Sequence, residues 1–180
     1  MTASSRGSSR PRSGGSGARL RRLAPADRGP IERLLRATGA FREDEIAVAL
    51  ELVDAEPAQG YSFLVAEAQG EVAGYACFGA TPMTQGTFDL YWIAVDPARQ
   101  GQGIGRALLR GAEDAIREEG GRLLLVETAG KEAYAATRAV YEACGYREVA
   151  RVPDFYAEGD DKVVYARRLG PDYPGTPEPG

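Results

Sequence analysis

Residues 100–105 bring three glycines together at a place where a strand is predicted to end and a helix to begin. The run reads Gln100-Gly101-Gln102-Gly103-Ile104-Gly105. Glycines let backbone N–H groups turn toward one concavity where a side chain would block a phosphate, and the start of a helix adds partial positive charge. The run therefore predicts an anion site suited to a pyrophosphate, and the flanking Arg99 and Arg106 could add charged contacts.

Other interpretations of the glycine run are weaker. A Walker loop needs GxxxxGK followed by Ser or Thr, and the chain contains no such run. The dinucleotide fingerprint GxGxxG fails at its third glycine, where Arg106 or Leu108 stands instead. A glycine-rich turn that only starts a helix remains open.

Two segments resemble the hallmarks of one family. Residues 92–97 and 99–109, which include the glycine run, resemble the signature of the GNAT superfamily of N-acetyltransferases. Residues 139–146 resemble its second hallmark, a helix that carries a tyrosine and ends in Gly-Phe or Gly-Tyr. The resemblance covers residues 19–169. It implies a single α/β (α+β) domain with a mixed, mostly antiparallel sheet and flanking helices, acetyl-CoA as the acetyl donor, and no metal.

The resemblance also implies the contacts with acetyl-CoA. The family's pyrophosphate pattern is met by Gln100, Gly103 and Gly105, and the backbone of the preceding strand would bond to the pantetheine arm. Many members carry an asparagine seven residues before the tyrosine; here Tyr134 stands there, and its hydroxyl, or that of Thr137, would substitute. The residues expected at acetyl-CoA are Ile93, Ala94, Val95, Gln100, Gly101, Gln102, Gly103, Ile104, Gly105, Arg106, Tyr134 and Thr137.

Tyr141 is the expected general acid. Acetyl transfer from a thioester needs a proton for the departing thiolate, which a closely placed phenol can donate. Helical spacing puts Tyr141 on one face with Thr137 and Cys144, so this face is predicted to point inward. By the resemblance, Tyr141 lies beside the CoA sulfur. The alternative is a core tyrosine with a satisfied hydroxyl.

Glu127 is the expected general base. It follows an apolar stretch at 123–126, where partial burial would raise the pKa of a carboxylate toward neutrality. It resembles the glutamate of the ribosomal-protein alanine acetyltransferases in the same superfamily. A solvated strand-end glutamate is the alternative, and Asp89 and Tyr91 are the reserve candidates.

The amine acceptor is expected to meet carboxylates and aromatic rings. Residues 153–161 are predicted to form a loop rich in both, and such a surface attracts an ammonium group unless it is only a solvated turn. The expected acceptor contacts are Asp89, Tyr91, Asp154 and Tyr156. A small amine, an amino acid and a peptide N-terminus all fit this chemistry.

These residues must be positioned by a series of short elements. Strands are predicted at 19–23, 61–68, 72–79, 87–95, 123–126, 146–152 and 162–169. Helices are predicted after Asp27, which should cap the first, and at 43–53, from 104 to about 119, and at 131–144.

Composition limits the chemistry further. The 180 residues include no His, which excludes Ser-His-Asp and Cys-His catalysis and most zinc sites. Neither Cys77 nor Cys144 has metal-ligand or disulfide spacing, and Cys144 is expected to serve packing. These features favour a cytoplasmic protein. No apolar stretch approaches the length of a membrane span.

Charge and the chain ends complete the expectations. Six of the 22 basic residues lie within residues 1–22, which hold no acid, so the remainder is strongly acidic and unsuited to nucleic acid. Residues 1–18 and 170–180 are predicted to be disordered tails around a domain at 19–169. The expected protein is a monomer or homodimer. Its activity is an N-acetyltransferase acting in a ternary complex, or alternatively a CoA-binding sensor or interaction module without turnover.

Overall fold

The computed structural model describes residues 17–55 and 60–170. Most of each predicted tail, at 1–16 and 171–180, lies outside these residues. Ala18, which the prediction placed in the first tail, packs against the larger apolar cluster.

The described residues form one seven-stranded sheet in the order β1-β2-β3-β4-β5-β7-β6. Its strands are β1 (Arg19–Arg22), β2 (Tyr61–Ala68), β3 (Glu71–Ala80), β4 (Thr87–Val95), β5 (Leu123–Ala129), β6 (Arg147–Ala157) and β7 (Asp160–Arg168). Only β4 and β5 run parallel; every other neighbouring pair is antiparallel. The predicted fold class, a mixed and mostly antiparallel sheet, is confirmed.

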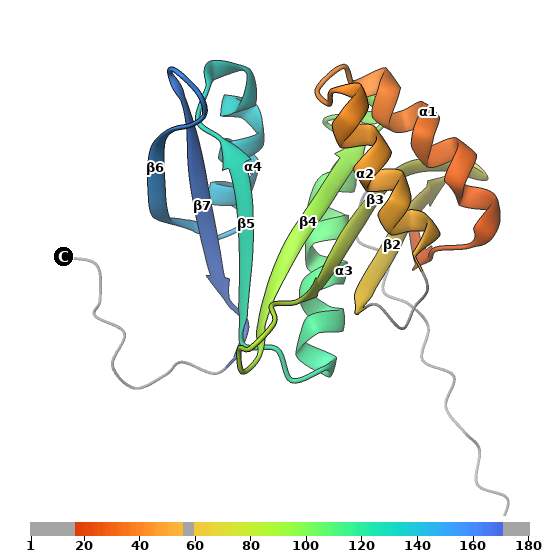
Figure 1. Cartoon of the computed structure of the whole chain (residues 1–180). Coiled ribbons are helices and arrows are strands. Elements are labelled where there is room, and N and C mark those ends of the chain that lie inside the picture. The colour runs from red at the N-terminus through yellow and green to blue at the C-terminus, as the bar shows by residue number, and fades with distance from the viewer. Residues whose placement is uncertain (1–16, 56–59, 171–180) are drawn as a thin grey trace, which may run out of the picture.

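Helices cover both faces of the sheet (Figure 1). Helices α1 (Arg28–Thr38) and α2 (Glu43–Asp54) lie on one face of β2–β4, and α3 (Ile104–Glu118) crosses the other. Helix α4 (Ala135–Ala143) lies beside β5 and β7. The short 3₁₀ turns are η1 (Pro25–Asp27), η3 (Pro97–Arg99) and η4 (Glu132–Tyr134).

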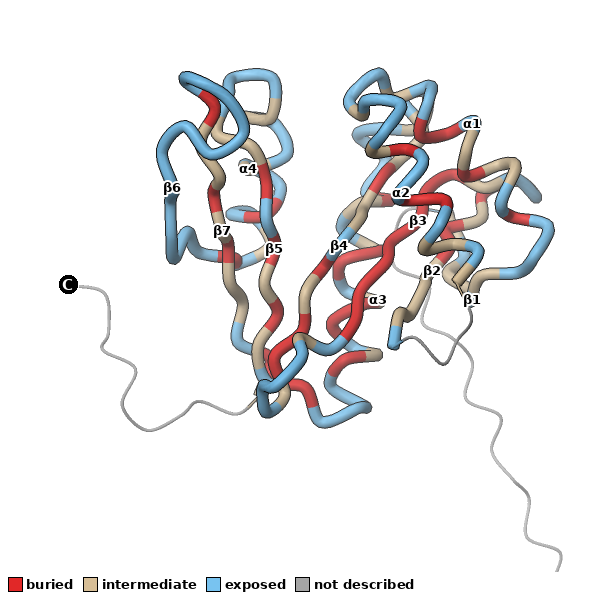
Figure 2. The backbone as a smooth tube through the Cα atoms, in the orientation of Figure 1, coloured by how far each residue is buried: buried red, intermediate tan, exposed pale blue. Residues whose placement is uncertain are grey.

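Two apolar clusters hold these layers together. The stripe of α3, including Ile104, Leu108 and Ile116, packs with one face of the sheet, as its helical spacing predicted. The apolar side chains of α1 and α2 pack with the other face, where Tyr75 is fully buried. Figure 2 shows that burial follows β3 and the paired part of β4. This core fixes the strand ends on which the site is built.

The parallel pair β4–β5 is short. The two strands pair only where residues 87–90 lie beside 123–126, and beyond these residues they diverge (Figure 1). The pairing of β3 with β4 shifts at the same level, so that Tyr91 has no partner on β3 and forms a β-bulge. The divergence separates one arm, with β1–β4, from another, with β5–β7 and α4.

Three local predictions are wrong. Residues 153–161 are not a loop, because β6 continues to Ala157 and β7 begins at Asp160. A bulge with Asp154 at φ 54° lets this irregular stretch remain in the hairpin. Helix α4 begins at Ala135 rather than 131, after η4. Asp27 lies at the N-cap of α1, but its carboxylate binds Arg21 and the Ala24 amide instead of capping that helix.

Candidate active site

The glycine run forms the turn that opens α3. Gly101 has φ 77° and Gly103 has φ 81°, a left-handed conformation that side chains disfavour. The first α3 bond runs from the Ala107 amide to the Gly103 carbonyl, so the amides of residues 104–106 have no acceptor within the helix. Free amides and left-handed glycines at a helix start provide the cradle that a diphosphate requires.

The two arginines beside the run differ in availability. Arg99 donates to Glu71 at 3.1 Å and is already paired. Arg106 is exposed and forms no ion pair with any residue that the structure describes. Arg106 is therefore the better placed of the two to meet a phosphate.

The backbone of β4 is unpaired on one side where the strands diverge. Ile93, Ala94 and Val95 pair with β3, but the pairing of β4 with β5 ends at Leu90, so these three residues have no partner on β5. Strand edges of this kind accept an added extended chain. A pantetheine arm, which carries two amides, has the shape and hydrogen-bonding groups for such a position.

Strand alternation separates two sets of side chains at the divergence. Leu90 and Val126 belong to the α3 cluster, so Asp89 and Glu127 point to the opposite face of the sheet. A pocket of about 230 Å³ is lined by Asp89, Leu90, Tyr91 and Glu127. The structure thus brings together Glu127 and both reserve candidates.

The two carboxylates of this pocket have different partners. The Glu127 carboxylate forms an ion pair with the Lys162 ammonium at 2.6 Å, and its side chain is 51% exposed, so the expected partial burial is wrong. Lys162 also lies 4.9 Å from the centre of the Phe155 ring, which holds it in place. Asp89 accepts from the Thr81 hydroxyl at 2.6 Å. Asp89 therefore has a neutral partner and forms no ion pair within the described residues.

Tyr141 lies on the other face, within the α3 cluster. It is 4% exposed, and burial raises the pKa of its phenol above the ordinary value, which keeps the proton on the oxygen at neutral pH. Its ring lies between those of Tyr146 and Tyr165. Its hydroxyl forms no hydrogen bond within the described part of the chain. This differs from the core tyrosine with a satisfied hydroxyl that the sequence left open.

Tyr134 and Thr137 occupy different surroundings. The Tyr134 hydroxyl donates to the Ala40 carbonyl at 3.0 Å, which joins η4 to the loop between α1 and α2. Its ring receives the Lys131 ammonium at 5.6 Å from the centroid. Thr137 is exposed on α4, although its helical spacing with Tyr141 predicted an inward position. The Tyr134 hydroxyl thus bridges the two arms across the divergence.

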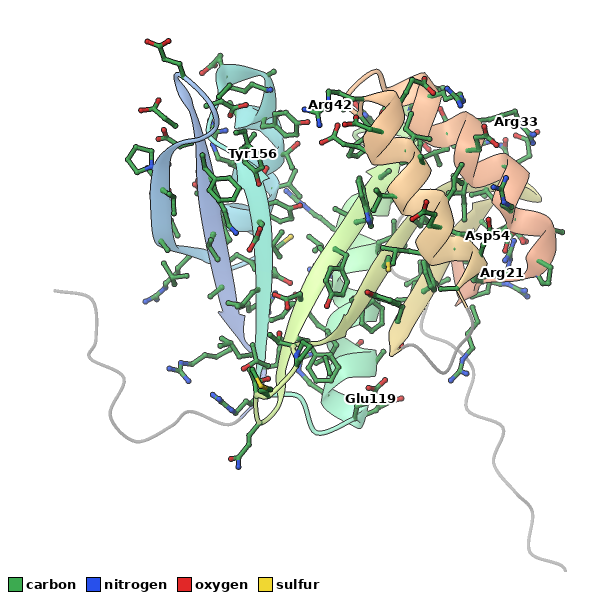
Figure 3. All side chains as sticks on the ribbon, viewed as in Figure 1. Arg21, Arg33, Arg42, Asp54, Glu119 and Tyr156 are labelled. Atoms are coloured by element: carbon green, nitrogen blue, oxygen red, sulfur yellow. The ribbon has the colours of Figure 1, made fainter. Side chains whose placement is uncertain are left out.

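Asp154 and Tyr156 lie on the exposed strand β6. Asp154 accepts from the Gly159 amide at 2.7 Å, which stabilises the hairpin, and it does not line the pocket. Burial and the charge of Glu127 raise the pKa of Tyr156. Figure 3 shows Tyr156 on one arm and Arg42 on the other. Like Asp154, Tyr156 is not one of the residues that line the pocket.

Sequence reasoning missed Lys162 and Ala40. The sequence carries a faint signal for Lys162, because a lysine opens a strand whose next residues are apolar. Ala40 acts through its backbone carbonyl, and an alanine gives no signal of that role. Both contacts depend on strands or loops that are distant in sequence.

The described residues contain neither a metal-binding cluster nor a membrane-spanning helix. Within residues 17–55 and 60–170, no group of three or more His, Cys, Asp or Glu side chains is arranged to hold a metal ion. No helix there has both the length and the apolar character needed to cross a membrane.

Comparison with known proteins identifies the family. A family model described as an acetyltransferase (GNAT) domain matches residues 59–148, half of the chain. The chain is 31% identical over 144 residues to aminoglycoside N(6')-acetyltransferase type 1 of Stenotrophomonas maltophilia, and the match covers 76% of this chain and 90% of that enzyme. The chain belongs to the GNAT family of acetyltransferases.

Further relatives agree on the fold and differ in acceptor. The chain is 34% identical over 94 residues to the ribosomal protein bS18-alanine N-acetyltransferase of Escherichia coli; the match covers 51% of this chain and only 62% of that enzyme. A GNAT-family crystal structure from Desulfovibrio desulfuricans is 45% identical, with a TM-score of 0.82 over 85% of this chain and 99% of that chain. The yncA protein of Salmonella typhimurium, solved with acetyl-CoA, has a TM-score of 0.71 at 24% identity over 89% of this chain and 98% of that chain, which shows a shared fold.

Proposed function

We propose that this protein transfers the acetyl group of acetyl-CoA directly to an amine within a ternary complex. The observation that carries the proposal is the divergence of β4 from β5. The glycine turn of α3 and the Tyr141 phenol lie on one side of this divergence. The pocket with Asp89 and Glu127 lies on the other side. A thioester held between the strands would meet an acid and a base from opposite faces.

The chemistry follows from this arrangement. The amides at the start of α3 bind the diphosphate of acetyl-CoA, and the free edge of β4 orients the pantetheine arm. Glu127 takes a proton from the ammonium, directly or through water, and the freed nitrogen attacks the thioester carbon. A C–N bond forms and the C–S bond breaks as Tyr141 gives its proton to the departing thiolate. The acylated nitrogen then loses its second proton to the Tyr141 phenolate, which restores the phenol, and Glu127 releases its proton to solvent.

Lys162 has a supporting role in this scheme. Its ammonium lies 2.6 Å from Glu127 and would hold this carboxylate in position to act as the base. Asp89, without a basic partner, attracts the positive charge of the incoming amine. We therefore assign proton removal to Glu127 and acceptor attraction to Asp89, Tyr91 and Tyr156.

The proposed acceptor is a primary amine that enters as a cation. A pocket of about 230 Å³ with two carboxylates and a tyrosine suits an ammonium group. The bridge from Tyr134 to Ala40 crosses the divergence and limits the width of an acceptor. The relatives are named for a ribosomal protein alanine and for an aminoglycoside as acceptors. An amine screen should therefore include amino acids, small amines and peptides with a free N-terminus.

We also propose a cytoplasmic protein that works as a monomer or homodimer, without a nucleic acid or membrane partner. Burial raises the pKa of the Cys77 thiol to about 12, and Cys144 packs against the core. Both thiols are unpaired, which suits a reducing compartment.

A screen of amines with detection of released CoA thiol tests the proposal. The wild-type protein is expected to release CoA in the presence of some amines, and mass spectrometry of the product should show one added acetyl group. Tyr141→Phe should lower kcat by about 10²–10⁴-fold, because the thiolate loses its proton donor. Its dissociation constant for acetyl-CoA, measured by calorimetry, should change by less than about threefold.

Other outcomes of the screen would contradict parts of this proposal. Tight binding of acetyl-CoA without turnover on any amine would favour a CoA-binding sensor. Full activity of Tyr141→Phe would remove that phenol from the mechanism. Failure to bind acetyl-CoA would show that the glycine turn has another purpose.

A further inference from the structure

A buried carboxylate lies behind the site, on α3. Glu113 is 2% exposed. Its Oε1 accepts from the Tyr146 hydroxyl at 3.0 Å and from the Arg167 guanidinium at 2.9 Å. Arg117 approaches its other oxygen at 3.5 Å from the solvent side. A buried charge is costly unless it is paired and hydrogen-bonded, so these contacts define where Glu113 and its partners can lie.

The contacts of Glu113 join the two arms. Helix α3 packs against β2, β3 and β4, whereas Tyr146 and Arg167 belong to the arm with β6 and β7. Arg167 also donates to the Cys144 carbonyl at the end of α4. In the sheet itself the arms are paired only over residues 87–90 and 123–126. Glu113 therefore adds a connection between them on the α3 side, in addition to the sheet pairing and the Tyr134–Ala40 bridge.

The same contacts reach the proposed general acid. The Tyr141 ring lies 5.9 Å from that of Tyr146 and 5.8 Å from that of Tyr165, measured between centroids. Tyr146 is anchored on Glu113, and the Tyr165 hydroxyl donates to Glu142 at 2.8 Å. Both rings that flank Tyr141 are thus held by carboxylates. Tyr141 has no anchor of its own among the described residues.

We propose that Glu113 is a positioning residue which, through Tyr146, sets the place of the Tyr141 phenol relative to the coenzyme. The inference rests on the acetyl transfer proposed above. Glu113 belongs to the helix whose first turn would hold the diphosphate, and lies about 14 Å along it from Ile104 at 1.5 Å per residue. One rigid helix therefore fixes both the coenzyme and the support of the acid. Small errors in such a distance reduce a rate strongly.

Steady-state kinetics of Tyr146→Phe test this role. The variant keeps the aromatic ring at position 146 and the Glu113–Arg167 ion pair, but it lacks the hydroxyl that donates to Glu113. Its kcat is expected to fall about tenfold, while KM for acetyl-CoA changes by less than about twofold, because only the placement of the acid is altered. Glu113→Leu should act in the same direction. Arg117→Gln is the matched control: it touches the same carboxylate without touching Tyr146, and its kcat should equal that of the wild type.

A second measurement reads the position of Tyr141 without turnover. With 3-fluorotyrosine placed at position 141, the ¹⁹F resonance of the CoA-bound protein should shift or broaden on Tyr146→Phe and remain unchanged on Arg117→Gln. A lower melting temperature with unchanged kcat and an unchanged resonance would mean that Glu113 serves stability alone, and would overturn the inference. A wild type that never acetylates an amine would instead refute the proposed function, and the resonance would still test whether Glu113 positions Tyr141.

Discussion

The chemistry of single residues depends on their immediate partners. Asp89 and Glu127 line one pocket, yet Glu127 is paired with Lys162 and Asp89 with the neutral Thr81 hydroxyl. Glu127 thus has a cationic partner, whereas Asp89 has none among the described residues and can attract a cation from solution. This difference separates the proposed base from the proposed acceptor contact.

Substitution of the two carboxylates should therefore affect different kinetic constants. Glu127→Gln should lower kcat by about 10²–10⁴-fold, because the amine loses its proton acceptor. Asp89→Asn, the matched change in the same pocket, should raise KM for the amine with a smaller effect on kcat. Steady-state kinetics of both variants with the amine concentration varied would check both. The reverse pattern would assign the base to Asp89.

At the scale of elements, the start of α3 determines whether the coenzyme binds. Gly101 has φ 77° in the turn before the helix, and Gly120 has φ 78° just after its other end. A Cβ at either position would meet no atom within 4 Å. The two glycines therefore have the same left-handed backbone conformation near opposite ends of α3. Only Gly101 lies at the end where we propose that the diphosphate binds.

This symmetry gives a controlled test of the glycine turn. Gly101→Ala and Gly120→Ala should each lower the free energy of unfolding by about 1–2 kcal/mol, the cost of a left-handed L-residue. Only Gly101→Ala should weaken acetyl-CoA binding, by about tenfold in calorimetry, because its methyl group enters the phosphate cradle. Equal acetyl-CoA affinity in the two variants would mean that the diphosphate lies elsewhere.

At the scale of the whole molecule, a partly buried ion pair ties the N-terminal segment to the sheet. Arg21 of β1 donates to both carboxylate oxygens of Asp27, at 2.6 and 2.8 Å, and to Glu67 of β2 at 2.7 Å. The bond with Arg21 holds the pKa of Asp27 below its ordinary value. The carboxylate is therefore ionised across the neutral and mildly acidic range, and it stabilises the entry into α1.

Asp27→Asn should destabilise the protein in a pH-dependent way. At pH 7 the free energy of unfolding should fall by roughly 1.5–3 kcal/mol, the range for hydrogen bonds to charged groups. Because the folded-state pKa is depressed, this contribution is present above the unfolded pKa of about 3.9 and is lost as the pH falls through the folded value. Urea denaturation of the wild type and the variant at pH 7, 5 and 3 would show whether the difference between their free energies of unfolding becomes smaller as the pH falls.

An exposed ion pair provides the control for that experiment. Asp44 pairs with Arg42 at 2.9 Å on the surface, and both side chains are more than two-thirds exposed. Asp44→Asn should leave the unfolding free energy nearly unchanged, because solvent screens such pairs. A difference for Asp27→Asn that persisted at pH 3 would show that its effect is not ionic.

Much of the local structure follows from the sequence. The predicted ranges 61–68 and 87–95 agree with β2 and β4. These strands are predictable because β-branched and aromatic residues favour a strand, and glycine or proline ends it, through interactions between residues close in sequence. The glycine turn at the start of α3 was predicted for the same reason. At the C-terminal hairpin the approach failed, because Pro153 and the acidic residues around it resemble a loop while long-range pairing with β7 keeps them in a strand.

The sequence by itself determined the order of the elements, the family and the residue types of the site, because these depend on spacing along the chain. Tertiary structure alone decided how the types are used. The exposure of Glu127 beside Lys162, the Tyr134–Ala40 bridge between residues 94 positions apart, and the buried Glu113 behind Tyr141 each join separate elements. Burial and pairing are properties of the packed chain, and local sequence cannot specify which distant group will come within hydrogen-bonding distance.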